Sequence, residues 1–141
     1  MAFQKVQGGS FAPSFGAAFE MIWEQTLFYG LGYEMGFVPK QDSVSGAKLH
    51  RFGINTGVIF QLDEYERHHL LALFRPGFSM VRSDAGNATR FGLGLGIGYE
   101  YSINSDYIIC PEIVYHKYPS GAGTRPGFSN WSFAVRVSFG K

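Results

Sequence analysis

One stretch, Arg90 to Ser102 (RFGLGLGIGYEYS), constrains the fold more than any other, because large and small residues alternate along it without a break. The large residues are Phe91, Leu93, Leu95, Ile97, Tyr99 and Tyr101, and those between them are Gly92, Gly94, Gly96, Gly98, Glu100 and Ser102. Successive side chains of a β-strand point to opposite faces, whereas a helix repeats about every 3.6 residues. The stretch therefore predicts a strand with one large apolar face and one nearly bare face.

Similar alternation recurs along most of the chain, so the direction of the apolar faces decides the class of protein. The apolar faces carry more large side chains than the narrow interior of a small eight-stranded barrel can hold. If they faced water they would form a far larger apolar surface than soluble monomers expose. We therefore predict that the apolar faces contact lipid and that the glycine faces line a narrow lumen.

Composition separates this chain from an ordinary soluble domain. Its 141 residues suffice for one small barrel, and only 16% are charged, whereas 17% are aromatic and 19 are glycine. Soluble domains have about 25% charged residues. The net charge is +1 without a basic run, so we expect no nucleic-acid partner. The single cysteine, Cys110, cannot form an internal disulfide and is expected to be a small apolar residue in a strand.

Neither a transmembrane helix nor a secretory signal is visible in the sequence. No apolar run reaches the length of about 18 residues that a membrane-spanning helix needs. Residues 1–10 lack a basic region followed by an apolar one, so we expect the chain to be a mature form with the signal peptide absent.

The alternation marks seven clear strands, joined by connections that are alternately short and long. The strands cover residues 11–23, 27–37, 51–62, 69–82, 90–102, 107–118 and 131–139. The long connections are 38–50, 83–89 and 119–130, and this asymmetry is typical of transmembrane barrels. The predicted fold is all-β, a small antiparallel up-and-down transmembrane β-barrel of about eight strands.

Two points stay open: which residues form the eighth strand, and how two prolines affect the strands that contain them. Residues 1–10 would form a short N-terminal strand or tail, and 11–141 would form the transmembrane β-barrel domain. The eighth strand is either residues 2–9 or missing from this chain. Pro76 lacks an N–H for the ladder and favours a bulge or a local edge. Pro111 could shift the register and so change the face on which His116 lies.

The last strand carries the most specific resemblance to a known family. From Phe11 to Phe139 the pattern resembles the small eight-stranded outer-membrane barrels of the opacity-protein and outer membrane protein A type. The end of the chain is similar to the signal by which such proteins are recognised for insertion, although Ala134 stands where glycine is usual and two residues follow the phenylalanine. The positions that correspond are Ser132, Ala134, Val137 and Phe139.

The resemblance implies a location and a set of partners. The protein would reside in the bacterial outer membrane, surrounded by membrane lipid and lipopolysaccharide, after insertion by the barrel-assembly machinery. It would be a structural or binding protein rather than an enzyme, and its loops 38–50, 83–89 and 119–130 would contact a protein or surface-lipid partner.

The inward faces carry a few charges of both signs. They are Glu20, Glu34, Glu100, Glu112, Arg51, Arg75 and Arg136. Isolated charges in a narrow lumen would be strongly destabilising, so we predict that they pair as a network that plugs the barrel. A gated pore, in which the pairs regroup, and a catalytic carboxylate are the alternatives.

Two other functions remain as alternatives. The segment from His116 to Ser120 is loosely similar to the end of outer-membrane lipid A deacylases, in which a serine follows the catalytic histidine by two residues; here Tyr118 stands there. A soluble calycin-like barrel holding a lipid inside would need the opposite facing of the alternation.

No cofactor or metal site is expected. His68 and His69 are adjacent on a strand and face opposite ways, with no third ligand nearby. The glycines of GLGLGIG are not followed by a helical pattern, so they do not indicate a nucleotide-binding loop.

Overall fold

The computed structural model describes residues 2–6, 11–24, 26–38, 47–65, 67–83, 86–104, 107–119 and 128–139. These residues form eight strands: β1 (Ala2–Val6), β2 (Phe11–Trp23), β3 (Leu27–Val38), β4 (Ala47–Gln61), β5 (His68–Ser83), β6 (Gly86–Ser102), β7 (Tyr107–Tyr118) and β8 (Phe128–Phe139). Across these ranges no helix is long and apolar enough to cross a bilayer.

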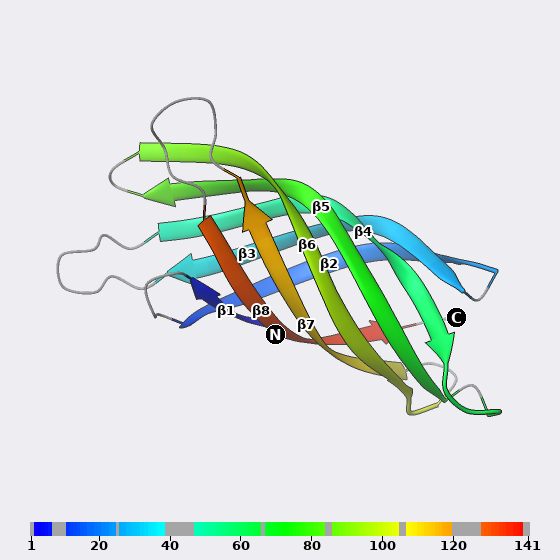
Figure 1. The fold of residues 1–141 in the computed structure, drawn as a ribbon. Coiled ribbons are helices and arrows are strands. Elements are labelled where there is room, and N and C mark those ends of the chain that lie inside the picture. Colours follow the sequence, from blue (N-terminus) through cyan, green and yellow to red (C-terminus); the bar gives the residue numbers. More distant parts are fainter. Residues whose placement is uncertain are drawn as a thin grey trace.

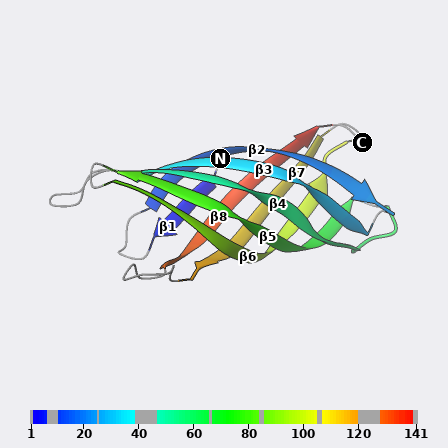
Figure 2. The same ribbon diagram turned by 90° about the horizontal axis from the view of Figure 1, so that it is seen from above.

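Each strand pairs antiparallel with the next, and β1 also pairs with β8, which closes the barrel (Figures 1 and 2). The predicted fold class is thereby confirmed. Residues 2–6 supply the eighth strand, because Ala2–Val6 pairs with β2 on one side and β8 on the other.

The closing strand β1 is much shorter than its neighbours (Figure 1). It pairs with residues 11–14 of β2 and with residues 130–134 of β8. Among the described residues, no strand pairs with this side of β2 from Phe15 to Trp23. Gly16 and Ala18, on the inner face of this part of β2, are accordingly exposed.

The large residues of the alternation face outwards, as predicted. Leu93, Leu95 and Ile97 are 45%, 62% and 59% exposed, while residues on the opposite face of the neighbouring β7 are buried. A soluble barrel with its apolar faces inside is therefore not the architecture observed. The alternation, which is set by the period of a strand, predicted this facing correctly.

Aromatic residues form a row at each end of the outer surface. Toward the end with the 39–46 and 120–127 connections, cross-strand rings contact each other in the pairs Tyr33–Phe52, Phe78–Phe91 and Tyr115–Trp131. Toward the other end lie the exposed rings of Trp23, Tyr29, Tyr99, Tyr101 and Tyr107. Two such rows match the two interfaces of a membrane.

Neither proline changes the register. Pairing between β4 and β5 lapses beside Pro76, and pairing between β6 and β7 lapses beside Pro111, but the pairs on either side of each lapse keep one register. A missing N–H removes one ladder bond without adding a residue to the strand. The lapse beside Pro76 agrees with the predicted local edge, and no bulge forms there. The register shift suggested for Pro111 is wrong, and His116 lies on the inner face.

The predicted long connections are shorter than expected because the strands extend further. Strand pairing reaches Ser83 and Gly86, so 83 and 86–89 of the predicted loop 83–89 belong to β5 and β6. Likewise 47–50 belong to β4 and 128–130 to β8. Beyond the bilayer both faces of a strand meet water, and its polar residues resemble a loop in sequence. Residues 39–46, 84–85 and 120–127 lie outside the described part of the chain.

Candidate functional site

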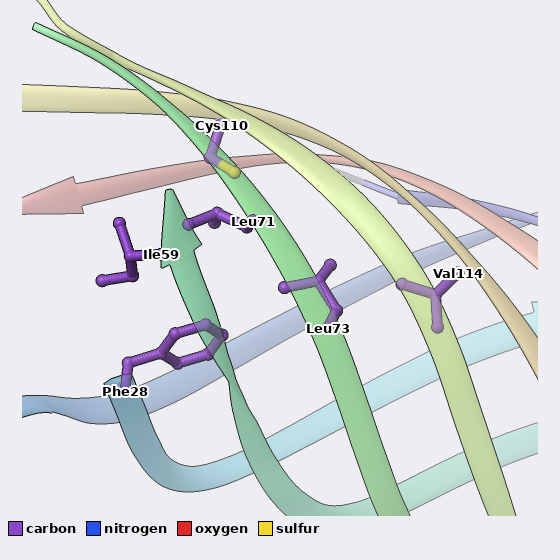
Figure 3. Packing of buried hydrophobic residues seen from close by; sticks show 6 residues of the cluster. All are labelled: Phe28, Ile59, Leu71, Leu73, Cys110 and Val114. Atoms are coloured by element: carbon purple, nitrogen blue, oxygen red, sulfur yellow. The ribbon is translucent and has the colours of Figure 1, made fainter. Parts of the chain in front are cut away.

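The barrel interior contains an apolar layer near the short connections. Its members point into the space that the strands enclose (Figure 3): Phe28, Ile59, Leu71, Leu73, Cys110 and Val114. Sequence reasoning missed this layer, although Leu71 and Leu73 interrupt the expected small inner face of β5. Apolar side chains fill much of the lumen at this level, and the guanidinium of Arg136 lies over the ring of Phe28.

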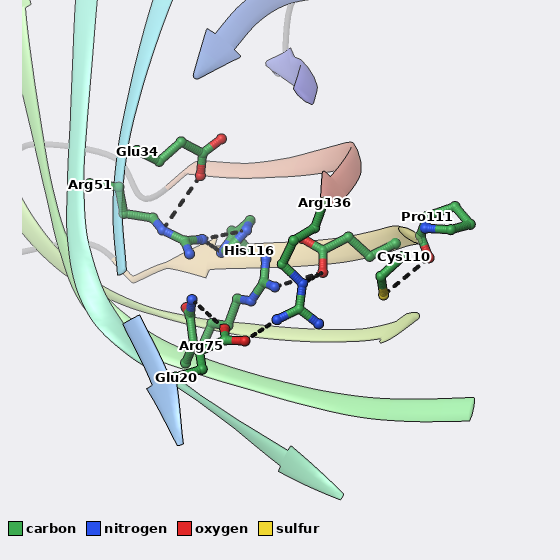
Figure 4. A network of polar contacts seen from close by, with 10 residues as sticks. Glu20, Glu34, Arg51, Arg75, Cys110, Pro111, His116 and Arg136 are labelled. Carbon is green, nitrogen blue, oxygen red and sulfur yellow. Dashed lines mark hydrogen bonds and ion pairs between the residues drawn. The ribbon is translucent and has the colours of Figure 1, made fainter. Parts of the chain in front are cut away.

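A chain of alternating charges lies beside this layer (Figure 4). The guanidinium Nη2 of Arg75 is 2.8 Å from Oε2 of Glu112, and Nε of Arg136 is 4.0 Å from the same oxygen. Arg136 also forms an ion pair with Glu20. Arg136 belongs to β8 and Glu20 to β2, so this last contact spans the part of the barrel that β1 does not reach.

A second group joins β3, β4 and β7. Nε of Arg51 is 3.7 Å from Oε2 of Glu34, whose other oxygen accepts a 2.7 Å hydrogen bond from Ser14 Oγ. Nη1 of Arg51 lies 2.9 Å and 2.7 Å from the two ring nitrogens of His116. A neutral imidazole has one acceptor nitrogen, so one of these approaches is the hydrogen bond.

The structure brings most of the predicted charge network together. Glu20, Glu34, Arg51, Arg75, Glu112 and Arg136 form ion pairs with one another, with equal numbers of carboxylates and guanidinium groups. Glu100 lies apart from them, and its Oε1 is 3.5 Å from Nδ1 of His69. Sequence reasoning placed these groups inside without identifying the pairs, because pairing depends on the register.

The glycines of β6 make room for the large inner side chains of β7. A Cβ added to Gly94 would lie 2.6 Å from Nδ1 of His116, and one added to Gly92 would lie 2.3 Å from the ring of Tyr118. A Cβ on Gly96 would lie 2.3 Å from the carbonyl oxygen of Ile113. The glycines of β6 therefore leave space in the lumen for the side chains of β7, while the large residues of β6 form part of the outer surface.

The described residues of the hydrolase alternative lie on the inner face of β7. His116 is 2% exposed and contacts Arg51, and Tyr118 lies two residues further on the same inner face. Ser120 lies outside the described residues.

The histidine pair faces two ways, as expected. Nδ1 of His68 is 2.5 Å from the hydroxyl of the outward-facing Tyr99, whereas His69 contacts Glu100. In the described part of the chain no three His, Cys, Asp or Glu side chains gather in a way that could hold a metal ion.

The residues of the insertion-signal resemblance lie on both faces of β8. Ser132 is buried in the lumen, and Ala134 shares its face two residues further along. Val137 and Phe139 are exposed on the outer face.

Comparisons with known proteins give a match at the level of fold. No family model matches the sequence, and no curated protein matches it significantly. The crystal structure of Ail, the attachment invasion locus protein of Yersinia pestis, matches with a TM-score of 0.64 and 12% identity over 98% of this chain and 91% of that chain. Ail in complex with the heparin analogue sucrose octasulfate matches with a TM-score of 0.64 and 11% identity over 98% and 92% of the two chains. This chain therefore has the fold of the small eight-stranded outer-membrane β-barrels.

Proposed function

We propose that the protein is a bacterial outer-membrane β-barrel whose filled lumen maintains the shape of the barrel, and that its long-connection end binds a partner at the cell surface. The observation that carries the proposal is the combination of a closed barrel, an apolar outer surface and an interior occupied by side chains.

The outer surface supports residence in a membrane. Residues such as Phe19, Leu31 and Leu95 are 73%, 71% and 62% exposed, and they belong to a belt that continues around the strands. Each 100 Å² of apolar surface transferred out of water is worth about 2.5 kcal/mol. A barrel with such a belt is stable when hydrocarbon covers it and aggregates when it does not.

The lumen supports a structural role over a pore. Removing one partner from a buried ion pair costs about 3–5 kcal/mol, and the network contains several such pairs. Ions crossing the barrel would have to separate these pairs and then pass the apolar layer around Leu71. A lumen built in this way favours a fixed barrel.

The binding role rests on the end of the barrel with the connections 39–46, 84–85 and 120–127. The solved complex of Ail with a heparin analogue makes a sulfated polysaccharide the first partner to test. Lipopolysaccharide and other outer-membrane lipid would surround the belt. During insertion the barrel-assembly machinery would read the last strand through Ser132, Ala134, Val137 and Phe139.

Reconstitution into planar bilayers tests the filled lumen. The protein is expected to insert from lipid vesicles and to give no large stable conductance. Large conductance steps that persist at low voltage would reject the proposed plug.

Binding of sucrose octasulfate or heparin to vesicles that carry the protein tests the surface role. The wild type is compared with a variant in which Gly-Ser linkers of equal length replace residues 39–46 and 120–127 and the strands are left intact. Binding that is lost only in this variant supports the proposal, whereas equal binding by both proteins contradicts the role of these connections.

A further inference from the structure

The short strand β1 leaves part of β2 and part of β8 without a partner strand on one side (Figure 1). Among the described residues, 16–22 of β2 pair only with β3, and 136–139 of β8 pair only with β7. We call these two edges the seam. Gly16 and Ala18, on the inner face of β2 at the seam, are exposed. The seam is therefore an open place in the wall of the barrel.

The seam lies at the depth of the hydrocarbon. Ala17, near one end of it, pairs with Tyr33 of the aromatic row toward the long connections. Trp23, just beyond its other end, belongs to the aromatic row toward the short connections. Backbone N–H and C=O groups without hydrogen bonds are strongly destabilising in hydrocarbon, and open sheet edges do not face lipid there. Acyl chains carry no hydrogen-bonding groups, so the seam calls for a partner with a backbone of its own.

The directions of the strands indicate what kind of partner fits. β1 pairs antiparallel with both β2 and β8, so β2 and β8 run in the same direction. One extended segment in line with β1 would therefore form antiparallel ladders with both edges. A second copy in the same membrane orientation offers, in the part of it that the structure describes, only these same two edges. They would meet the seam in parallel, which is the less stable arrangement.

The outward side chains beside the seam define half of the sequence pattern that would fit. Continued along the seam, the register of β1 places Phe19 of β2 and Phe139 of β8 on either side of one outward position. Each of these two phenylalanines is 73% exposed. Ala17 and Val137 flank the neighbouring outward position in the same way. Large apolar residues at these positions would pack between the two edges and face the lipid.

The inward side chains define the other half of the pattern. Arg136 of β8 and Glu20 of β2 form their ion pair on the inner side of the seam (Figure 4). Both side chains are largely buried, so they occupy the lumen next to the open edges. Inward positions of a fitting strand would therefore hold small residues, as the glycines of β6 do beside β7.

We propose that the seam binds one extended β-strand of another polypeptide, antiparallel to both β2 and β8, with apolar residues toward the lipid and small residues toward the lumen. Backbone hydrogen bonds to the two edges would provide the affinity, and the alternation of side chains would provide the specificity. The inference goes beyond the proposed function, because it concerns the wall of the barrel within the membrane. It needs the same residence in the membrane but no role for the long connections.

A synthetic peptide with the sequence of residues 93–100, LGLGIGYE, is the probe, because it has the required alternation. Its tyrosine is replaced by cysteine, which in the continued register would lie beside Ala17 and Val137. Directly opposite residues of antiparallel strands are close enough to form a disulfide. The protein variants are A17C and V137C, each combined with C110S because Cys110 is the native thiol.

The variants are reconstituted in lipid vesicles, and oxidation with copper–phenanthroline traps the bound peptide. L95C, also combined with C110S, is the matched control. Leu95 is 62% exposed on the outer face, but its strand is paired on both sides at this position. A second peptide of the same composition, with its large residues grouped together and its cysteine at the same position, tests the alternation.

We expect A17C and V137C each to trap at least about tenfold more of the alternating peptide than L95C does, because pairing raises the local concentration of the two thiols. The grouped peptide should be trapped only at the level of L95C. Equal trapping at all three positions would show adsorption to the apolar belt and would overturn the proposal, as would equal trapping of the two peptides. Disulfides between the A17C residues of two copies, formed in place of peptide adducts, would assign the seam to a second copy and also overturn it.

A parallel measurement separates this proposal from the proposed function. Insertion of the same proteins into lipid vesicles is followed through the fluorescence of Trp23 and Trp131. Normal insertion without trapping of the peptide defeats the strand-binding seam alone, whereas failure of the wild type to insert would overturn both.

Discussion

The imidazole ring of His116 lies against Gly94, its cross-strand partner on β6, at a distance that leaves no room for a methyl group. The same relationship repeats along the two strands, with Tyr118 beside Gly92 and Val114 beside Gly96. The glycine face of β6 thus leaves the space that the large inner side chains of β7 occupy. The glycine alternation is needed because β7 presents large side chains inwards.

Replacing Gly94 with alanine should therefore destabilise the barrel. The new Cβ would lie 2.6 Å and 2.7 Å from ring atoms of His116, which is buried and contacts Arg51, and 3.2 Å from Cβ of Arg75. Overpacking of this kind costs about 1–3 kcal/mol. Urea unfolding from lipid vesicles, monitored by tryptophan fluorescence, measures the loss.

Gly98→Ala is the control for that experiment, since Gly98 lies on the same face of the same strand. Its added Cβ would approach Sγ of Cys110 to 3.1 Å and other atoms no closer than 3.5 Å, so a smaller loss is expected. Equal losses from the two substitutions would contradict the explanation by local packing.

Leu71→Ala should cost more stability than Leu70→Ala, although the two residues are neighbours. Leu71 is 1% exposed inside the apolar layer, and its truncation leaves a cavity worth about 2–5 kcal/mol. Leu70 is 40% exposed on the outer face, where lipid can fill the space that a shorter side chain leaves. The free energies of unfolding from vesicles give the comparison, and a larger loss for Leu70→Ala would reverse the assigned facing.

The facing of the strands could be predicted from the sequence, but the contents of the lumen could be predicted only in part. Period-two alternation determines which residues share a face, and it placed Arg51, Arg75 and Glu112 inside. It does not determine which of them meet, because a partner is selected by the register between strands. The apolar layer escaped notice because residues such as Leu71 do not differ in kind from those that face lipid.

Strand ends were predicted less well than strand faces for a related reason. Residues 86–89 are small and polar and read as a loop, yet they pair with residues 80–83 across a hairpin. Hydrophobic alternation identifies only the part of a strand that has lipid on one face. Where both faces meet water the pattern disappears, although the ladder of backbone hydrogen bonds continues.

Glu112→Gln is expected to be among the more damaging single substitutions in the lumen. The Glu112 carboxylate lies between Arg75 and Arg136, and its removal leaves the buried Arg75 guanidinium without a counter-charge. The expected loss is about 3–5 kcal/mol. The double variant R75M/E112M removes both charges and should lose less than the single variant. Urea titrations of both in vesicles test this, and a double variant that is the less stable of the two would contradict the argument.

The turn between β4 and β5 should give a pH-dependent stability of a definite sign. Oδ1 of Asp63 accepts hydrogen bonds from the backbone N–H groups of Arg67 at 3.0 Å and His68 at 2.9 Å. Desolvation raises the pKa of the Asp63 carboxyl, but these two bonds together with the charges of His68 and His69 outweigh it, and the pKa is lowered from its ordinary value of 3.8. The charged carboxylate therefore stabilises the folded state above that ordinary value, and the contribution disappears as the pH falls through the lowered pKa.

Asp63→Asn should accordingly be less stable than the wild type at neutral pH, and the difference should shrink as the pH is lowered below about 3.8. Glu64→Gln is the matched control, because this exposed neighbour occupies the same turn and loses the same formal charge. Urea midpoints measured in zwitterionic vesicles between neutral and strongly acidic pH provide the readout. A difference between wild type and Asp63→Asn that stays constant over this range would mean that the charge on Asp63 does not stabilise the turn.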